Sequence, residues 1–204
     1  MKKLALILAI AAIAATANAN LLVNGSFETG DLTGWTTWRA PWGAGEQWNV
    51  VSTPCACDGG QLALELRGGN GSWGVLQCID VTPGLEVTLT ATIKAMNAGA
   101  NWYELLLFDG CVDGAHVDGN TTDDDIIAKW DSWGGYLGNP TEQCETVSGS
   151  RTPTGNQMTV ALKAGGANAL GWFDCITAEQ IPEPGTMMLL GMGLLGMAGL
   201  AKRR

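Results

Sequence analysis

The sequence has 204 residues, with 11 basic and 20 acidic side chains, one histidine and a formal net charge of −9 at pH 7. Five of the basic residues lie within the first three and the last three positions, so the rest of the chain has six basic against 20 acidic side chains, a net charge of −14. This composition argues against a nucleic-acid partner, which needs a basic surface. It favours cations or neutral polymers as partners, and it also keeps an exported chain soluble.

The N-terminal segment has the three parts of a secretory signal peptide. Met1-Lys2-Lys3 is basic, residues 4–15 are apolar, and Ala17-Asn18-Ala19 matches the small-x-small cleavage pattern. We expect the signal peptide to occupy residues 1–19 and to be removed by the secretion machinery, so that the mature chain begins at Asn20.

Residues 20–180 are expected to form one domain of short strands. Apolar residues alternate with polar ones over residues 61–67, 87–94 and 158–163, and a period of two is typical of strands with one buried and one exposed face. Residues 81–84, VTPG, predict a turn. About eight short strands separated by turns predict an all-β fold, most simply a jelly-roll β-sandwich. The further strands are expected over residues 47–52, 74–81, 102–108, 126–130 and 170–177.

All the cysteines lie in this domain, and their even number in an exported chain predicts up to three disulfides. The sequence does not select the pairing. Cys55 and Cys57 are too close to prefer each other, whereas Cys111 with Cys144 would close a loop of about 30 residues. A metal site is the weaker interpretation, because the chain has no C-x-x-C pair and only one histidine. The cysteines are Cys55, Cys57, Cys78, Cys111, Cys144 and Cys175.

Seven aspartates fall within residues 109–131. Their spacing lacks the alternating D-x-D-x-D-G pattern and the closing glutamate of an EF-hand loop. We therefore expect a long surface loop held by Cys111, with a surface calcium site as the less favoured alternative.

The chain has nine tryptophans against three phenylalanines and two tyrosines. A tryptophan ring offers a flat apolar face with one polar edge, which suits stacking on a sugar ring. For a single tryptophan, burial is the more common fate. The core candidates are Trp35, Trp48, Trp73 and Trp172. The glycan-contact candidates lie in or beside the aspartate-rich segment and are Trp102, Tyr103, Trp130, Trp133 and Tyr136.

Residues 21–28, LLVNGSFE, followed by a Gly-Trp pair, and residues 170–176, LGWFDCI, are similar to the opening and closing strands of galactose-binding-like and carbohydrate-binding-module-like jelly rolls. Residues 77–95 resemble the middle hairpin of that family. Cys175 and Ile176 depart from its closing pattern, which has a polar residue and valine at these places.

The same resemblance implies a structural calcium ion. In that family the first and last strands lie side by side, and the ion is often held by a carboxylate of the opening motif and the aspartate of the closing strand. The implied ligands here are Glu28 and Asp174, with backbone oxygens near Asn24. Calcium takes about six to eight oxygen ligands, including carboxylates and carbonyls. The alternative is that both side chains are solvated turn residues.

The last segment, residues 181–204, has three parts in order. Pro182-Glu183-Pro184 excludes a continuing helix or paired strand. Residues 186–201 are uncharged, and Lys202-Arg203-Arg204 ends the chain. A charge-free run with a basic end is typical of a transmembrane helix whose basic end is cytoplasmic. Its length of about 24 Å is short of a ~30 Å hydrocarbon core, which favours a temporary anchor.

This arrangement resembles the sorting signal of the PEP-CTERM proteins of Gram-negative bacteria. The resemblance implies recognition by an exosortase, a membrane cysteine protease, while the chain is transiently anchored in the inner membrane. The tail is then removed or exchanged, and the body is exported to the cell envelope or the extracellular space, often in species that make exopolysaccharide. An ordinary single-span anchor with a proline-rich stalk is the alternative.

No catalytic residues are indicated. His116 is the single histidine, no serine lies in a Gly-x-Ser-x-Gly turn, and paired carboxylates arise by chance among so many acids. The sequence therefore predicts a non-catalytic exported protein that binds extracellular polysaccharide. The alternatives are a structural matrix protein without a ligand and a secreted glycan-active hydrolase.

Overall fold

The computed structural model describes residues 20–55, 59–96, 101–119, 123–131 and 143–180. The predicted signal peptide and sorting tail, with its six motif residues, lie outside these ranges. Within the part of the chain that is described, no helix has the length and apolarity needed to cross a membrane.

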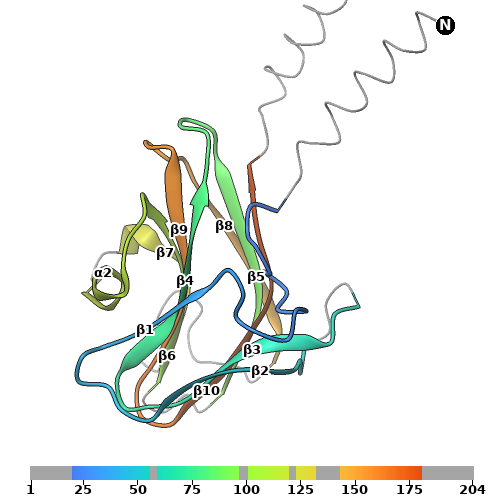
Figure 1. Cartoon of the computed structure of the whole chain (residues 1–204), viewed down its shortest axis with the longest axis vertical. Helices are drawn as coiled ribbons and strands as arrows, with labels where there is room; N and C mark the ends of the chain where they lie inside the picture. Colours follow the sequence, from blue (N-terminus) through green and yellow to red (C-terminus); the bar gives the residue numbers. More distant parts are fainter. Residues whose placement is uncertain (1–19, 56–58, 97–100, 120–122, 132–142, 181–204) are drawn as a thin grey trace, which may run out of the picture.

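The described strands form two five-stranded antiparallel sheets packed face to face (Figure 1). The predicted all-β sandwich is therefore confirmed. Sheet A has the order β1 (Thr36–Arg39), β4 (Ser72–Asp80), β9 (Gln157–Gly165), β6 (Trp102–Asp109) and β7 (Ile126–Asp131). Sheet B has the order β2 (Glu46–Ser52), β3 (Leu62–Gly68), β10 (Ala169–Gln180), β5 (Val87–Met96) and β8 (Glu145–Arg151).

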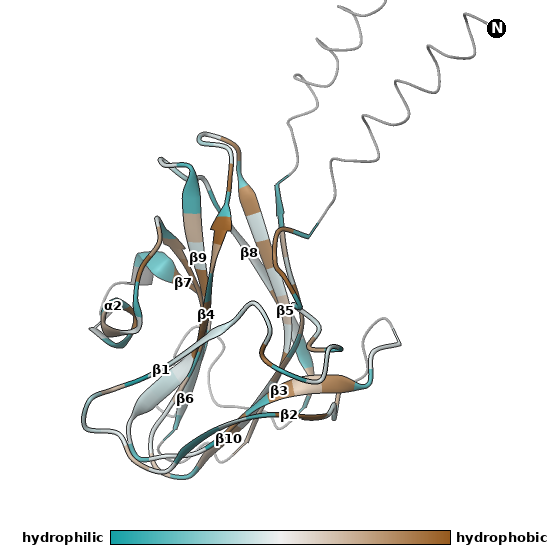
Figure 2. Cartoon of the chain, viewed as in Figure 1, coloured by the Kyte–Doolittle hydropathy of each residue, from teal (hydrophilic) through white to brown (hydrophobic). Residues whose placement is uncertain are grey.

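The core lies between the sheets and is filled by every second residue of the strands. On β3, for example, Leu64 and Leu66 are fully buried, whereas the residues between and after them face outward. Figure 2 shows hydrophobic colouring along β3 and β4, which border this core. Such burial is worth about 25 cal/mol per Å² of apolar surface, so the alternation that predicted the strands also supplies the stability of the sandwich.

Two of the predicted core tryptophans are confirmed as core residues. Trp73 is fully buried, and Trp35 stacks on Phe27 with ring centroids 5.6 Å apart. Trp48 is partly buried against the core and donates its indole N–H to the carbonyl oxygen of Gly74 at 2.7 Å. Trp172, the fourth candidate, lies half-buried on a strand of sheet B and is absent from the core cluster of buried residues in the described chain.

The opening segment lies beside the last strand, as the family resemblance implied. The backbone N–H of Leu21 donates to the carbonyl oxygen of Ala178 at 2.8 Å, and that of Ile176 donates to Gly25 at 3.0 Å. Gly25 is required at this approach, because a Cβ there would overlap the carbonyl oxygen of Ile176. The first and last described residues therefore emerge at the same end of the sandwich (Figure 1).

Two disulfides are described, Cys55–Cys144 and Cys78–Cys111, with Cα atoms 5.7 and 5.5 Å apart. The Cys111–Cys144 pairing, one of those that the sequence left open, is therefore excluded. Cys144 is paired instead with Cys55, which follows β2, and Cys111 with Cys78 of β4. Cys175 is also disulfide-bonded, and Cys57 lies outside the described residues.

The aspartate-rich segment is more ordered than the predicted surface loop. It contains α2 (Gly114–Gly119), the 3₁₀ turn η2 (Asp123–Asp125) and strand β7. Its aspartates have structural partners: Asp113 accepts the backbone N–H of His116 at 2.9 Å, and Asp118 accepts the Ser72 hydroxyl at 2.7 Å. The segment is a cover for one face of sheet A.

Candidate functional site

The outer face of sheet A is apolar at its centre and is covered by the chain itself. Trp38, Leu76, Leu106 and Phe108 form a second apolar cluster on this face, and Val117 of α2 packs onto it. α2 lies against the side of sheet A in Figure 1. The middle of this face is therefore unavailable to a ligand.

Next to this cluster, three charged side chains form a row across the strands. Glu104 on β6 is in register with Lys163 on β9 and Lys129 on β7. Its carboxylate lies 3.1 Å from the Lys163 amine and 3.8 Å from the Lys129 amine. The Lys163 amine also donates to the carbonyl oxygen of Val117 at 3.3 Å. Because Glu104 and Lys163 are both buried, each needs the other to offset its desolvation.

Trp102 lies one row further along the same face. It is half-buried, in register with Gly165 on β9, and its indole ring lies across that glycine, where a Cβ would overlap it. Trp102 is the described glycan candidate that the structure places on an outer face.

Tyr103 is fully buried and cannot contact a glycan, so this assignment is wrong. Its hydroxyl donates to the carbonyl oxygen of Met96 at 2.7 Å and accepts the backbone N–H of Leu170 at 2.8 Å. Burial raises the pKa of the Tyr103 phenol to about 12, so it remains a neutral donor that links β5, β6 and β10.

The other glycan candidates are not described in enough detail to place. Trp130 lies in β7, where its backbone pairs with that of Tyr103 in β6. The structure does not describe the Trp130 side chain. Trp133 and Tyr136 lie outside the described residues.

Trp42, which the sequence analysis did not single out, is 63% exposed and lies at the same end of the sandwich as Trp102. Its ring is close to Gly71, whose carbonyl oxygen accepts the N–H of Gly166 at 2.9 Å. Two tryptophans thus lie over neighbouring glycine backbones of the β3–β4 and β9–β10 loops. The sequence signal for the exposure of Trp42 was its position between proline and glycine. These two residues favour a turn, and a turn residue is not buried by a strand.

A buried carboxylate lies beneath Trp42. The Glu46 side chain has no exposed surface, and a Cβ at Gly43 would overlap one of its oxygens. Neither oxygen has a hydrogen-bond partner among the described residues, and the Arg39 guanidinium, itself 59% exposed, lies 3.7 Å away. This end of the molecule therefore combines the exposed Trp42, the half-buried Trp102 and an accessible guanidinium.

The predicted calcium ligands lie near the opposite end, where the opening segment meets β10. One oxygen of Glu28 accepts the backbone N–H groups of Gln61 and Leu62 at 2.8 and 2.9 Å, so Glu28 is held in place rather than merely solvated. Glu28 and Cys175 border a cavity of about 530 Å³ lined by the opening segment and the residues after Asp174.

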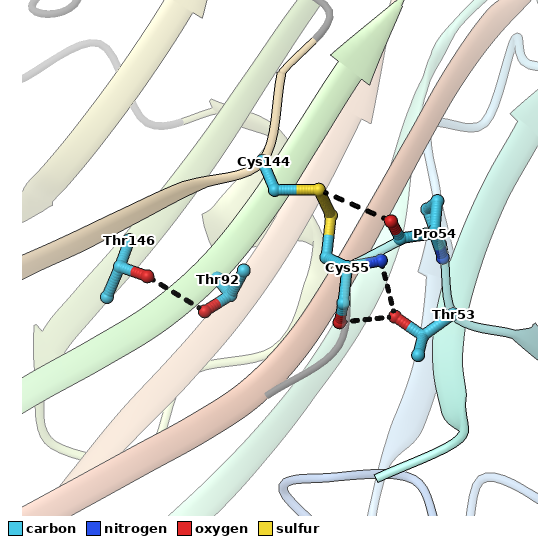
Figure 3. Close-up of a disulfide and its surroundings, with 6 residues drawn as sticks. All are labelled: Thr53, Pro54, Cys55, Thr92, Cys144 and Thr146. Atoms are coloured by element: carbon cyan, nitrogen blue, oxygen red, sulfur yellow. Dashed lines mark hydrogen bonds between the residues drawn. A yellow bond between two sulfur atoms is a disulfide. The ribbon is translucent and has the colours of Figure 1, made fainter. Parts of the chain in front are cut away.

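Asp174 is 1% exposed and is followed by a bulge in the β5–β10 pairing. Its Oδ1 accepts the N–H of Cys175 at 2.7 Å, and its Oδ2 has no hydrogen-bond partner among the described residues. The Thr53 hydroxyl lies close enough to Asp174 to lower the pKa of its carboxyl, and it donates to the carbonyl oxygen of Cys55 at 2.8 Å (Figure 3).

The charge state of Asp174 reflects this environment. Burial is the largest effect and raises the pKa of its carboxyl. The Cys175 N–H and the Thr53 hydroxyl lower that pKa, and the negative charge of Glu28 raises it. A buried carboxylate oxygen without a partner, next to a second carboxylate, is a donor set that fits a hard cation such as calcium.

The C-terminal residues 180–204 match the family model of the PEP-CTERM protein-sorting motif. The chain carries a PEP-CTERM sorting motif. The match contains the six predicted motif residues, from Pro182-Glu183-Pro184 to Lys202-Arg203-Arg204. The PEP-CTERM motif implies processing by an exosortase and export to the cell envelope or the extracellular space.

Solved structures similar to the PEP-CTERM body are β-sandwiches, mainly carbohydrate-binding modules. TmCBM61, solved with β-1,4-galactotriose, has a TM-score of 0.54 at 12% identity and covers 79% of this chain and 99% of its own. The CBM22-1 xylan-binding domain of Paenibacillus barcinonensis Xyn10C has a TM-score of 0.53 at 18% identity. The match covers 81% of this chain and 96% of that domain. At these identities the likeness concerns the fold.

A third similar structure is the enzymatically active domain of the bacteriophage CBA120 tailspike protein 4. Its TM-score is 0.55 at 12% identity, and the match covers 79% of this chain but only 21% of the tailspike domain. The chain thus spans about a fifth of that protein. No curated protein matches the sequence.

Proposed function

We propose that this protein is a non-catalytic glycan-binding protein that its sorting tail delivers to the cell envelope or extracellular polymer. The observation that carries this proposal is the placement of Trp42 and Trp102. Both lie at the end of the sandwich where β10 begins, next to loops held by the Gly166–Gly71 and Asn168–Gly69 hydrogen bonds. An exposed and a half-buried aromatic ring over glycine backbone offer a flat surface for a sugar ring.

The direction of the tail supports the same function. β10 runs from Ala169 to Gln180, which at ~3.3 Å per residue separates the tryptophan end from the tail by roughly 35 Å. A ligand surface at the end away from the tail would face outward while the protein is anchored.

Retention on immobilised neutral and acidic polysaccharides tests the proposal. We expect one or more to retain the mature protein, and Trp42→Ala or Trp102→Ala to weaken binding about five- to tenfold, because aromatic contacts contribute on the order of 1 kcal/mol. Val23→Ala, at an exposed apolar residue outside this end, should bind like the wild type. No retention by any polysaccharide would contradict the proposal and favour a structural matrix protein. Release of reducing ends would favour a hydrolase.

We also propose that Glu28 and Asp174 hold a structural calcium ion. The unpartnered Oδ2 of Asp174 and the free lone pairs of a fixed Glu28 carboxylate support this site, and the carbonyl oxygens of the opening segment can complete it. Bound calcium would offset the repulsion between the two carboxylates.

The melting temperature with calcium and with a chelator tests this site. Calcium should raise the melting temperature of the wild type, and Glu28→Gln or Asp174→Asn should abolish that increase. Glu86→Gln, which removes an exposed carboxylate on the β4–β5 loop, should leave it unchanged. An unchanged wild-type melting temperature would rule out the ion as a stabiliser.

A further inference from the structure

The outer face of sheet B carries a second aromatic position. Trp172 on β10 is in register with Glu65 on β3 and Lys94 on β5, so the three side chains form one row across the centre of the sheet. The Lys94 amine lies 5.9 Å from the centroid of the Trp172 ring. An indole flanked by an amine is a favourable place for a sugar ring that bears a negative group.

The next row towards the tryptophan end adds a guanidinium and a hollow. Arg67 is in register with Leu170, and its side chain is 59% exposed. A pocket of about 220 Å³ is lined by Arg67, Leu170, the paired strand-end residues Gly68 and Ala169, and Asn168, which precedes β10. The guanidinium therefore borders a depression with the half-buried Leu170 as part of its wall.

The charges of these two basic residues are poorly matched within the protein. Four of the six basic residues outside the terminal segments pair with carboxylates on sheet A or at its edges: Arg39, Lys129, Arg151 and Lys163. In the described part of the chain, Lys94 has no carboxylate within 4 Å, and Arg67 has only Glu65 at 4.0 Å. In a chain of such acidity, two basic side chains without close partners stand out.

The Glu65 carboxylate in this row offsets only one of the two positive charges of Lys94 and Arg67. Glu65 is buried and accepts the side-chain N–H of Asn49 at 3.3 Å. Asp174, the next acidic residue along β10, is only 1% exposed. The two rows together therefore carry a formal net charge of +1, from Lys94 and Arg67 against Glu65.

We propose that this face is a second binding site, for a saccharide bearing a carboxylate, such as a uronic acid unit of a polysaccharide. Arg67 would hold the carboxylate with its planar fork of donors. Trp172 would lie against the sugar ring, and Lys94 would add charge at its edge. The site involves no residue of the Trp42–Trp102 surface, so it stands whether or not that surface binds a glycan.

The protein would then have two binding surfaces. The two surfaces lie on opposite sheets near the same end of one rigid sandwich, so one molecule could hold two polymer strands. Linked sites of this kind raise avidity without any new contact.

The test is binding of the mature protein to polygalacturonate and to the same polymer after methyl esterification, without added calcium. About 0.15 M salt is suitable, because a Debye length of ~8 Å screens the repulsion from the acidic body while contacts at the site persist. We expect the acid form to bind at least about tenfold more tightly than the ester.

The variants separate this site from the other surface. Arg67→Gln, Lys94→Gln and Trp172→Ala should each weaken binding to the acid form several-fold, whereas Trp172→Phe should retain part of it. Lys129→Gln removes the same charge from sheet A and should leave binding of the acid polymer unchanged. Circular dichroism checks that each variant is folded.

Two outcomes would overturn the proposal. Equal binding of acid and ester would show that no carboxylate is recognised. If Lys129→Gln and Arg67→Gln weakened binding of the acid polymer equally, binding would depend on net charge and not on this site. Neither outcome bears on retention of neutral glycans by the wild type, which tests the Trp42–Trp102 surface separately.

Discussion

The outer faces of the two sheets differ, although both sheets are five-stranded and antiparallel. The face of sheet A is apolar at its centre and is covered by α2 and the segment around it. The face of sheet B carries paired hydroxyls between β5 and β8, from Thr88–Ser150 at 2.9 Å to Thr92–Thr146 at 3.1 Å. The chain therefore covers its own surface on one side and leaves a polar surface for solvent or ligand on the other.

Both faces bury carboxylates, and Glu104 and Asp174 have different surroundings. Glu104 on sheet A has a buried lysine 3.1 Å away. Asp174 on sheet B has no ion pair within 4 Å among the described residues, and burial raises its pKa. A buried carboxylate that is paired with a lysine, such as Glu104, stabilises the fold. A buried carboxylate without such a partner, such as Asp174, can bind a cation from solution.

The largest effect is expected from removing the matched carboxylate. Glu104→Ala leaves Lys163 buried without its partner and should lower the free energy of unfolding by roughly 3–5 kcal/mol. Chemical denaturation measures this. Glu104→Gln, which keeps the shape and one acceptor, should cost less, and Lys129→Ala, at a partly exposed side chain, about 1 kcal/mol or less. A loss below about 1 kcal/mol in Glu104→Ala would mean that the row of charges does not stabilise the fold.

An intermediate effect is expected from the unmatched carboxylate, and it depends on pH. Without calcium, the raised pKa means that the folded state favours protonated Asp174. Stability should therefore decrease as the pH rises from 3.8, the ordinary value, through the raised pKa. Asp174→Asn should be more stable than the wild type at neutral pH in a chelator and should lose this part of the pH dependence.

Thermal unfolding between pH 4 and 7 in chelator checks this prediction, with Glu86→Gln as the control that keeps Asp174. If the wild type and Asp174→Asn had parallel pH profiles, the carboxylate would not titrate in this range. In calcium the order should reverse, because the wild type alone keeps both proposed ligands.

The sequence predicted the strands that alternate and the sandwich they form, because burial of one face per strand leaves a period of two. The sequence also indicates which faces of β6 are buried. Trp102 and Tyr103 are neighbours in one strand and must point to opposite faces, so only one of them could contact a ligand. The apolar run of residues 105–108 indicated a strand buried on both faces, which is where α2 covers sheet A.

Other features could not be predicted from local pattern. The edge strand β8, ETVSGSR, has one apolar residue, and β1 has only four residues, so neither shows a clear period. The Cys55–Cys144 pairing spans 89 residues and depends on how the sheets bring distant segments together. The exposure of Trp172 follows from its register between Glu65 and Lys94, which only the sheet order fixes.

The smallest effect is expected from the hydroxyl pairs of sheet B. The hydroxyl oxygens of Thr90 and Ser148 are 3.0 Å apart on the exposed face. Cross-strand pairs of this kind contribute roughly 0.2–1 kcal/mol to stability. Thr90→Ala should therefore lower the free energy of unfolding by about 0.5 kcal/mol. Thr90→Val, which keeps the β-branched shape, should separate the hydroxyl contact from strand propensity. A loss as large as that of Glu104→Ala would show that the hydroxyl face is part of the folded core, contrary to the contrast between the two sheets.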